Sequence, residues 1–115
     1  MRLRHSLAAA AGAAALILTL PGSAHAAEGD FHYTYVDSTG EEQQATLHDP
    51  HSGECVMLPE AAQEYHQPPA HSPENRTDSF AIVFTNADCS GDTFTLRSHT
   101  GGASERLKLR SVLFS

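Results

Sequence analysis

The sequence has little positive charge and lacks the common catalytic motifs. Only 7 of its 115 residues are lysine or arginine, against 14 aspartates and glutamates. An acidic surface of this kind repels nucleic acid and anionic lipid, so neither is expected as a partner. No G-x-S-x-G or H-E-x-x-H motif arranges the serines, histidines and carboxylates into a catalytic frame. We therefore expect a non-enzymatic protein that needs no cofactor.

The longest apolar stretch, residues 7–20, is too short to span a membrane, which takes about 20 apolar residues. A basic segment precedes this stretch, Pro21-Gly22 ends it, and Ala24-His25-Ala26 has the small–x–small pattern of a signal peptidase site. We predict a cleaved secretory signal peptide over residues 1–26 and an extracellular mature chain. No cysteine stands at the cleavage point, so a membrane anchor is not expected, and the alanine-rich signal is typical of bacteria.

Removal of the signal leaves a single small domain, residues 27–115, that keeps five of the basic residues and all 14 acidic ones. Cys55 and Cys89 are its only cysteines, and an exported chain with two cysteines is expected to pair them. The closed loop would stabilise the fold by roughly 3–4 kcal/mol. A catalytic thiol or a metal thiolate pair is the alternative, but the two thiols lie far apart and there is no C-x-x-C motif.

The mature chain has the pattern of short strands separated by turns. Phe31, Tyr33 and Tyr35 alternate with polar residues, which predicts a strand with three aromatic side chains on one face. Residues 80–84 and 93–96 are predicted to pair as a hairpin. Gly91 in the connecting turn, residues 86–92, supplies a positive φ.

Weaker signals complete an all-β fold, a small Greek-key-like sandwich or barrel. Further short strands are expected at residues 44–47, 55–58 and 107–114. In the last of these, Arg106, Lys108 and Arg110 suit a solvated face, and a bulge is expected near Ser111. A single helical turn is expected at residues 61–66.

Residues 59–78 are polar and rich in proline, which predicts a surface loop within the Cys55–Cys89 segment. Tyr65 is its one aromatic residue and Arg76 its one cation, and both residue types are favoured as interface anchors. Proline and the disulfide would lower the entropy lost when such a loop binds. This is the candidate binding loop; the alternative is a tolerated, disordered insertion without a function.

Six histidines in the mature chain raise the question of metal binding. The turn His48-Asp49-Pro50-His51 places three potential ligands within four residues, which zinc or copper could use. The alternative is that these histidines are solvated and become charged in mild acid.

The sequence also contains a weak internal repeat. Residues 33–40 and 84–91 share an aromatic residue, a following threonine, an aspartate and a glycine at the same offsets, and residues 47–53 resemble residues 96–102. The pattern suggests two duplicated units with pseudo-two-fold packing; the alternative is a chance match of turn residues.

Phe84, the Cys89-Ser-Gly segment and Ser111 together resemble the βγ-crystallin-type Greek key, in which two aromatic residues and a glycine are followed by a serine that opens the last strand. Cys89 stands where that pattern has its second aromatic, and Ser38 stands there in the other copy. The calcium-binding acidic pair of that family is replaced by residues 106–110, so no calcium site is implied. Secreted bacterial members of the family include protease inhibitors and killer-toxin-like proteins. The chain also looks like the small two-cysteine proteins that bacteria export.

These observations lead to a secreted, monomeric binding module as the first hypothesis, with an extracellular protein or protease as partner and inhibition of that protease as its most specific form. The alternatives are a secreted metal-binding protein that uses His48, Asp49 and His51, and a structural protein of the cell surface.

Overall fold

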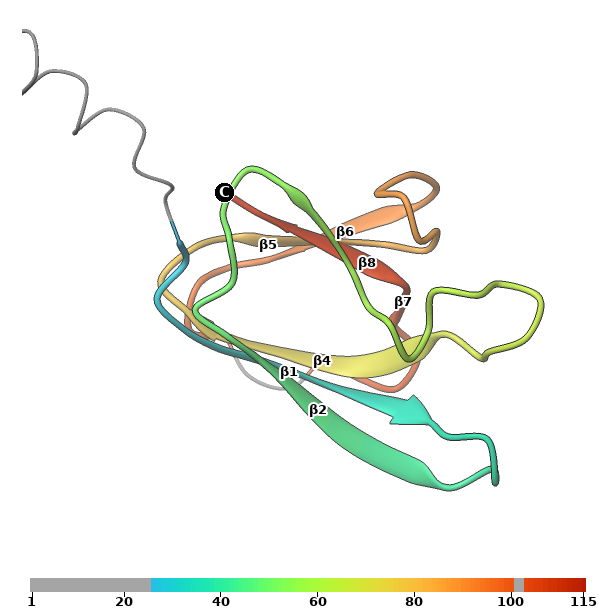
Figure 1. Cartoon of the computed structure of the whole chain (residues 1–115). Helices are drawn as coiled ribbons and strands as arrows, with labels where there is room; N and C mark the ends of the chain where they lie inside the picture. Colours follow the sequence, from blue (N-terminus) through green and yellow to red (C-terminus); the bar gives the residue numbers. More distant parts are fainter. Residues whose placement is uncertain (1–25, 101–102) are drawn as a thin grey trace, which may run out of the picture.

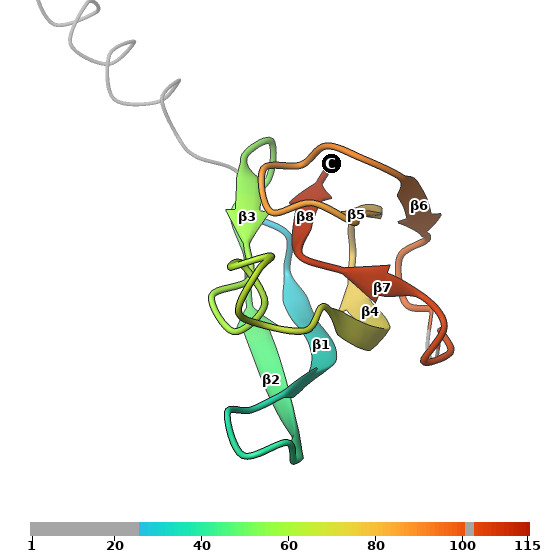
Figure 2. The ribbon, with the colours of Figure 1, turned by 90° about the vertical axis from the view of Figure 1, so that its right-hand side faces the viewer.

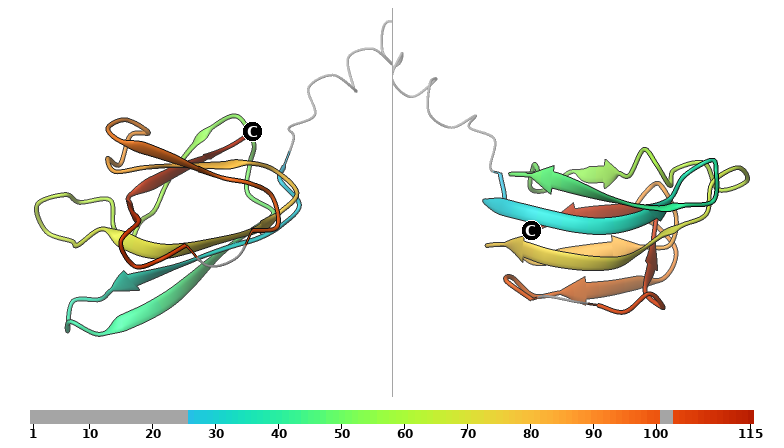
Figure 3. Two further views of the ribbon diagram at one scale, coloured as in Figure 1. Left: turned by 180° about the vertical axis from the view of Figure 1, so that it is seen from behind. Right: turned by 90° about the horizontal axis from the view of Figure 1, so that it is seen from below.

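The computed structural model describes residues 26–100 and 103–115, which form two four-stranded antiparallel sheets packed face to face (Figures 1 and 3). The strands are β1 (Gly29–Val36), β2 (Glu42–His48), β3 (Cys55–Met57), β4 (Ala70–Thr77), β5 (Ala81–Phe84), β6 (Thr93–Leu96), β7 (Lys108–Leu109) and β8 (Ser111–Phe114). The predicted all-β fold is confirmed. The predicted signal peptide lies outside the described residues, apart from Ala26. In the described part, no helix is long and apolar enough to cross a membrane.

The sheet orders reveal a topological repeat. The first sheet runs β2-β1-β4-β7 and the second runs β6-β5-β8-β3 when read from its other edge. The first half of the chain, β1 to β4, places three strands in the first sheet and its third strand, β3, in the second. The second half, β5 to β8, places three strands in the second sheet and its third strand, β7, in the first. The similar segments 33–40 and 84–91 each span the end of the first strand and the following turn of their own half.

The predicted aromatic face of β1 supplies much of the core. Phe31 and Tyr33 are buried and Tyr35 is half-buried. The Phe31 ring meets Phe114 of β8 edge-on, with 5.4 Å between ring centroids, so this pair joins the two sheets. Full burial of one such side chain is worth roughly 1.5–3 kcal/mol. Val83 of β5, Leu109 of β7 and other buried apolar residues belong to the same core.

The surface loop predicted at residues 59–78 is wrong from Ala70 onward, because β4 is an inner strand of the first sheet between β1 and β7. Proline argued against such a strand, but Pro73 lies at a β-bulge. His32 pairs with Glu74 and Thr34 with His71, which leaves two residues of β4 opposite Tyr33 alone. A bulge interrupts the ladder of hydrogen bonds, so a proline without an N–H is tolerated there.

Asn75 and Thr77 of β4 are polar yet fully buried, because their side chains form hydrogen bonds within the protein. The Asn75 side chain is fully buried. Its amide nitrogen donates to the carbonyl oxygens of Ser79, Leu96 and Arg97 at 2.7, 3.2 and 3.0 Å, and its Oδ1 accepts from the hydroxyl and the backbone N–H of Thr77. These hydrogen bonds offset the desolvation penalty that excludes unpaired polar groups from a core.

The expected last strand, residues 107–114, is two strands in different sheets. The chain leaves the first sheet after Leu109 and enters the second at Ser111, so the phase slip near Ser111 is a crossing between layers. Arg110 stands at this crossing.

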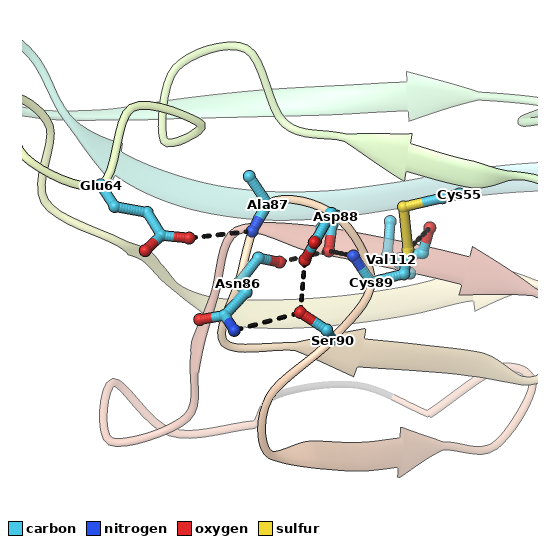
Figure 4. The surroundings of a disulfide bond; sticks show 9 residues. Cys55, Glu64, Asn86, Ala87, Asp88, Cys89, Ser90 and Val112 are labelled. Carbon is cyan, nitrogen blue, oxygen red and sulfur yellow. Dashed lines mark hydrogen bonds between the residues drawn. A yellow bond between two sulfur atoms is a disulfide. The ribbon is translucent and has the colours of Figure 1, made fainter.

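The predicted hairpin and disulfide are both confirmed. β5 pairs with β6 from Ala81–Leu96 to Phe84–Thr93. The disulfide Cys55–Cys89 ties the connecting turn to β3, with 5.9 Å between the Cα atoms (Figure 4). The turn is also attached to β8: the N–H of Cys89 donates to Ser111 Oγ at 3.0 Å, and that hydroxyl donates to the carbonyl of Asn86 at 2.5 Å.

Candidate functional site

The part of the predicted binding loop that remains a loop is residues 58–69, called here the β3–β4 loop. It projects from the end of the sandwich opposite the C-terminus (Figure 1), the end that faces the viewer in Figure 2. Tyr65 is 95% exposed. The structure therefore supports a loop around Tyr65, shorter than the one predicted.

Arg110 fixes the base of the β3–β4 loop. One guanidinium nitrogen, Nη1, donates to the carbonyl oxygens of Ala61 at 2.8 Å and Gln67 at 2.9 Å, which lie on the two sides of the loop. Arg110 is half-buried, so its predicted place on a solvated face is wrong. A hydrogen bond to a charged group contributes about 1.5–3 kcal/mol, and these two bonds close the loop across its width.

Buried groups hold the N-terminal side of the loop. Leu58 and Ala61 are fully buried. The hydroxyl of Tyr33 donates to Glu60 Oε1 at 2.6 Å. Burial, with the neighbouring Glu60 carboxylate as a second cause, raises the pKa of Tyr33 well above its usual range. The phenol therefore stays protonated, and remains a donor to Glu60, at any physiological pH.

The outer part of the loop is a closed turn. The N–H groups of His66 and Gln67 both donate to the carbonyl of Gln63, at 3.0 and 2.8 Å, and the side chain of Gln67 accepts from the N–H of Gln63 at 2.9 Å. The predicted helical turn at residues 61–66 thus exists as one hydrogen-bonded turn, and no helix forms there. Glu64 reaches the β5–β6 turn, where its Oε2 lies 3.4 Å from the backbone nitrogen of Ala87 (Figure 4).

A groove of about 240 Å³ separates the loop from the β1–β2 turn. Its walls are Tyr35, Val36, Asp37 and Ser38 on one side and Glu60, His66, Gln67 and Pro68 on the other. Hydrogen bonds from the Thr39 hydroxyl and the backbone N–H of Glu41 lower the pKa of Asp37 to about 2. Asp37 therefore keeps its negative charge at neutral and mildly acidic pH, and the groove has an acidic wall.

Arg76, the other predicted anchor, lies away from this loop. It is near the far end of β4, seven residues beyond the end of the loop, which is about 23 Å along an extended strand. Its guanidinium pairs with Glu74, with 2.7 Å between Nη2 and Oε2. The structure does not bring Arg76 and Tyr65 together.

The predicted metal ligands lie at the end of β2 and in the turn after it. His48 Nδ1 is 2.7 Å from Asp30 Oδ1, and His48 Nε2 is 3.3 Å from Asp49 Oδ2. The hydrogen bond to Asp30, together with the charge of Asp49, raises the pKa of His48. His51 is exposed, and its backbone forms a bridge with Ala26. Among the residues described by the structure, no group of three or more histidine, cysteine or acidic side chains is arranged to hold a metal ion.

The residues that position the loop, Arg110 and Glu60, were not singled out from the sequence. Arg110 lies 49 and 43 residues from the two carbonyls it binds, and Glu60 lies 27 residues from Tyr33. No local pattern relates such distant groups. One signal was available: the alternation of the last strand fails at Ser111, the residue directly after Arg110.

Comparison of the chain with protein-family models, with curated proteins and with solved structures finds no match.

Proposed function

We propose that this protein is a secreted, non-enzymatic binding module that docks to an extracellular protein through the β3–β4 loop, and that its most specific activity is inhibition of a secreted protease. One observation carries the proposal: an almost fully exposed aromatic residue, Tyr65, lies on a loop whose base is held by Arg110.

A loop that is ordered before binding loses less conformational entropy when it binds. Arg110 joins the two sides of the loop, and the turn centred on Gln63 and Gln67 orders its outer part. The disulfide at Cys55 restrains the strand that leads into it. An exposed tyrosine on such a support is a favourable interface anchor, since tyrosine is enriched among the residues that dominate binding energies.

Inhibition is the favoured version for two further reasons. Phe84, the Cys89-Ser-Gly segment and Ser111 resemble the βγ-crystallin-type pattern, and proteins with that pattern include bacterial protease inhibitors. In addition, Pro68 and Pro69 follow the turn. Proline has no backbone N–H to donate to a protease cleft, so an extended segment that contains these residues makes a poor substrate. Export agrees with this role, because the disulfide persists in an oxidising compartment.

The test is a titration of the processed, oxidised protein against a panel of secreted serine proteases and metalloproteases. Inhibition at stoichiometric amounts is expected for at least one of them. Rapid degradation of the protein without inhibition of any protease would exclude the inhibitor function.

A matched pair of variants tests the role of the loop base. Arg110→Gln removes the charged bonds to Ala61 and Gln67, so weaker inhibition and faster cleavage within residues 58–69 are expected. Arg106→Gln removes a nearby exposed arginine and should change neither. Equal behaviour of the two variants would contradict a preorganised loop.

A further inference from the structure

Within the proposed inhibitor function, on which this inference rests, the geometry points to a partner class. We propose that Tyr65 enters the primary specificity pocket of the bound protease, and that the partner is a protease whose apolar pocket accepts large aromatic side chains. The turn that carries Tyr65 binds in a folded form and is not cleaved as a substrate.

Tyr65 is the one large apolar side chain that the β3–β4 loop offers to a partner. It is 95% exposed, whereas Leu58, the other large apolar residue of the loop, is fully buried in the core. The remaining exposed large hydrophobic residues, Met57, Phe80 and Phe94, are only 55%, 49% and 53% exposed and lie in or beside strands of the second sheet. An aromatic side chain buries about 150–250 Å² in a pocket, so Tyr65 would dominate any apolar contact of this loop.

The charges of the loop exclude the other common pocket type. Residues 58–69 contain no lysine or arginine, so nothing in the loop complements the acidic pocket of a protease that cleaves after basic residues. Glu60, Glu64 and the nearby Asp37 add negative charge around the loop. A basic-specific pocket would therefore place like charges opposite one another, which is unfavourable. An apolar pocket avoids this conflict.

The backbone around Tyr65 is closed. The carbonyl of Gln63 accepts from two N–H groups, those of His66 and Gln67, and the Gln67 side chain returns to the N–H of Gln63. Extension of this segment breaks all three hydrogen bonds. Hydrolysis needs a scissile carbonyl held in near-attack geometry to the catalytic group of the protease. A segment that stays folded presents its side chain to the pocket, while its peptide bonds stay out of line with that group.

The experiment compares the processed wild type and four variants against three proteases, one preferring aromatic residues, one basic residues and one small residues. The wild type is expected to inhibit the aromatic-preferring enzyme best. Tyr65→Ala should weaken that inhibition by about 30-fold or more, the effect of losing an anchor residue. Tyr65→Phe should remain within a few-fold of wild type, and Tyr65→Arg should shift inhibition toward the basic-specific enzyme.

Phe94→Ala is the matched control, because it removes an exposed aromatic residue of β6 that is outside the loop. It should leave inhibition unchanged. Each variant is first compared with wild type by circular dichroism and thermal unfolding. Since Tyr65 makes almost no contact with the core, its variants are expected to fold normally.

Two outcomes separate this inference from the function beneath it. Inhibition by the wild type that Tyr65→Ala leaves intact would overturn the role of Tyr65 while the inhibitor function stands. No inhibition of any protease by the wild type would remove both. Mass spectrometry of the stable complex supplies the last criterion: an intact chain is expected, and cleavage on either side of Tyr65 would contradict folded-turn binding.

Discussion

The β1–β2 and β5–β6 hairpins occupy equivalent places in the two halves, yet the β5–β6 turn is tied to distant strands as well as closed locally. The β1–β2 turn is closed locally by Asp37, whose carboxylate accepts from the Thr39 hydroxyl at 2.6 Å and the N–H of Glu41 at 3.0 Å. The β5–β6 turn has local hydrogen bonds too, from the Ser90 hydroxyl to Asp88 and from Asn86 Nδ2 to Ser90 Oγ (Figure 4). In addition it is attached to distant strands, by the disulfide to Cys55 and by the hydroxyl of Ser111.

The two turns share the bond from a hydroxyl to an aspartate two residues earlier, and they share a backbone conformation. Gly40 and Gly91 have nearly the same φ, 88° and 90°, in the region that favours glycine. The repeated sequence therefore specifies the path of each turn, whereas its attachments depend on the half to which it belongs. The attached β5–β6 turn supports the β3–β4 loop through Glu64, and the locally closed β1–β2 turn forms the opposite wall of the groove.

The largest expected effect comes from loss of the disulfide, which only the β5–β6 turn has. Replacement of Cys55 and Cys89 by serine should lower the free energy of unfolding by about 3–4 kcal/mol. The melting temperature should then fall by more than about 12 °C for a domain of this size. Unfolding of the oxidised protein, with and without a reducing agent, provides the same comparison without mutation. A change under about 1 kcal/mol would show that the other contacts of this turn suffice.

Gly91→Ala and Gly40→Ala form a matched pair that compares the two turns directly. Both introduce strain at positive φ, which costs about 1–2 kcal/mol. A Cβ at Gly40 has no neighbour within 4 Å, whereas at Gly91 it would lie 2.4 Å from Thr85 Oγ1 and 2.9 Å from Asn86 Nδ2. Thr85 cannot move freely, because its hydroxyl accepts from the N–H of Asp92.

Chemical denaturation should therefore show Gly91→Ala to be the more damaging of the two, by about 1–2 kcal/mol, because of this added overlap. Equal costs would mean that the β5–β6 turn relaxes as readily as the β1–β2 turn.

Ser111→Ala tests the attachment of the β5–β6 turn to β8. The substitution leaves the N–H of Cys89 and the carbonyl of Asn86 without this partner, at an expected cost of about 1–2 kcal/mol in the free energy of unfolding. Ser115→Ala, at an exposed serine after β8, should stay within about 0.5 kcal/mol of wild type. Similar melting temperatures for both variants would argue against the attachment.

The smallest effect is expected at Asp37, and it depends on pH. Its pKa falls from 3.8 to about 2 in the folded state, so its stabilising contribution is complete above about pH 4 and is lost as the pH falls through 2. Asp37→Asn should remove this part of the acid dependence and lower stability slightly at neutral pH. The control is Asp92→Asn, at an exposed aspartate of the β5–β6 turn, which should retain the wild-type profile between pH 4 and 2.

Residues whose role is local were predictable. The alternation of Phe31, Tyr33 and Tyr35, the hairpin around Gly91 and the pairing of the only two cysteines each follow from neighbouring residues or from a single possible partner. The position of Tyr65 on an exposed loop was predictable for the same reason. The extent of that loop was not, because the proline and polar residues of β4 have the composition of a loop.

The all-β fold, the single disulfide and an exposed tyrosine between the third and fourth strands could thus be predicted from the amino-acid sequence. The tertiary fold, in contrast, buries Asn75 in an inner strand, joins the third strand of each half to the other sheet, and lets Arg110 close the base of the β3–β4 loop. The physical reason is the range of the interactions. Alternation and turn conformation act between neighbouring residues, whereas a buried amide or guanidinium is stable only where distant carbonyl groups converge on it.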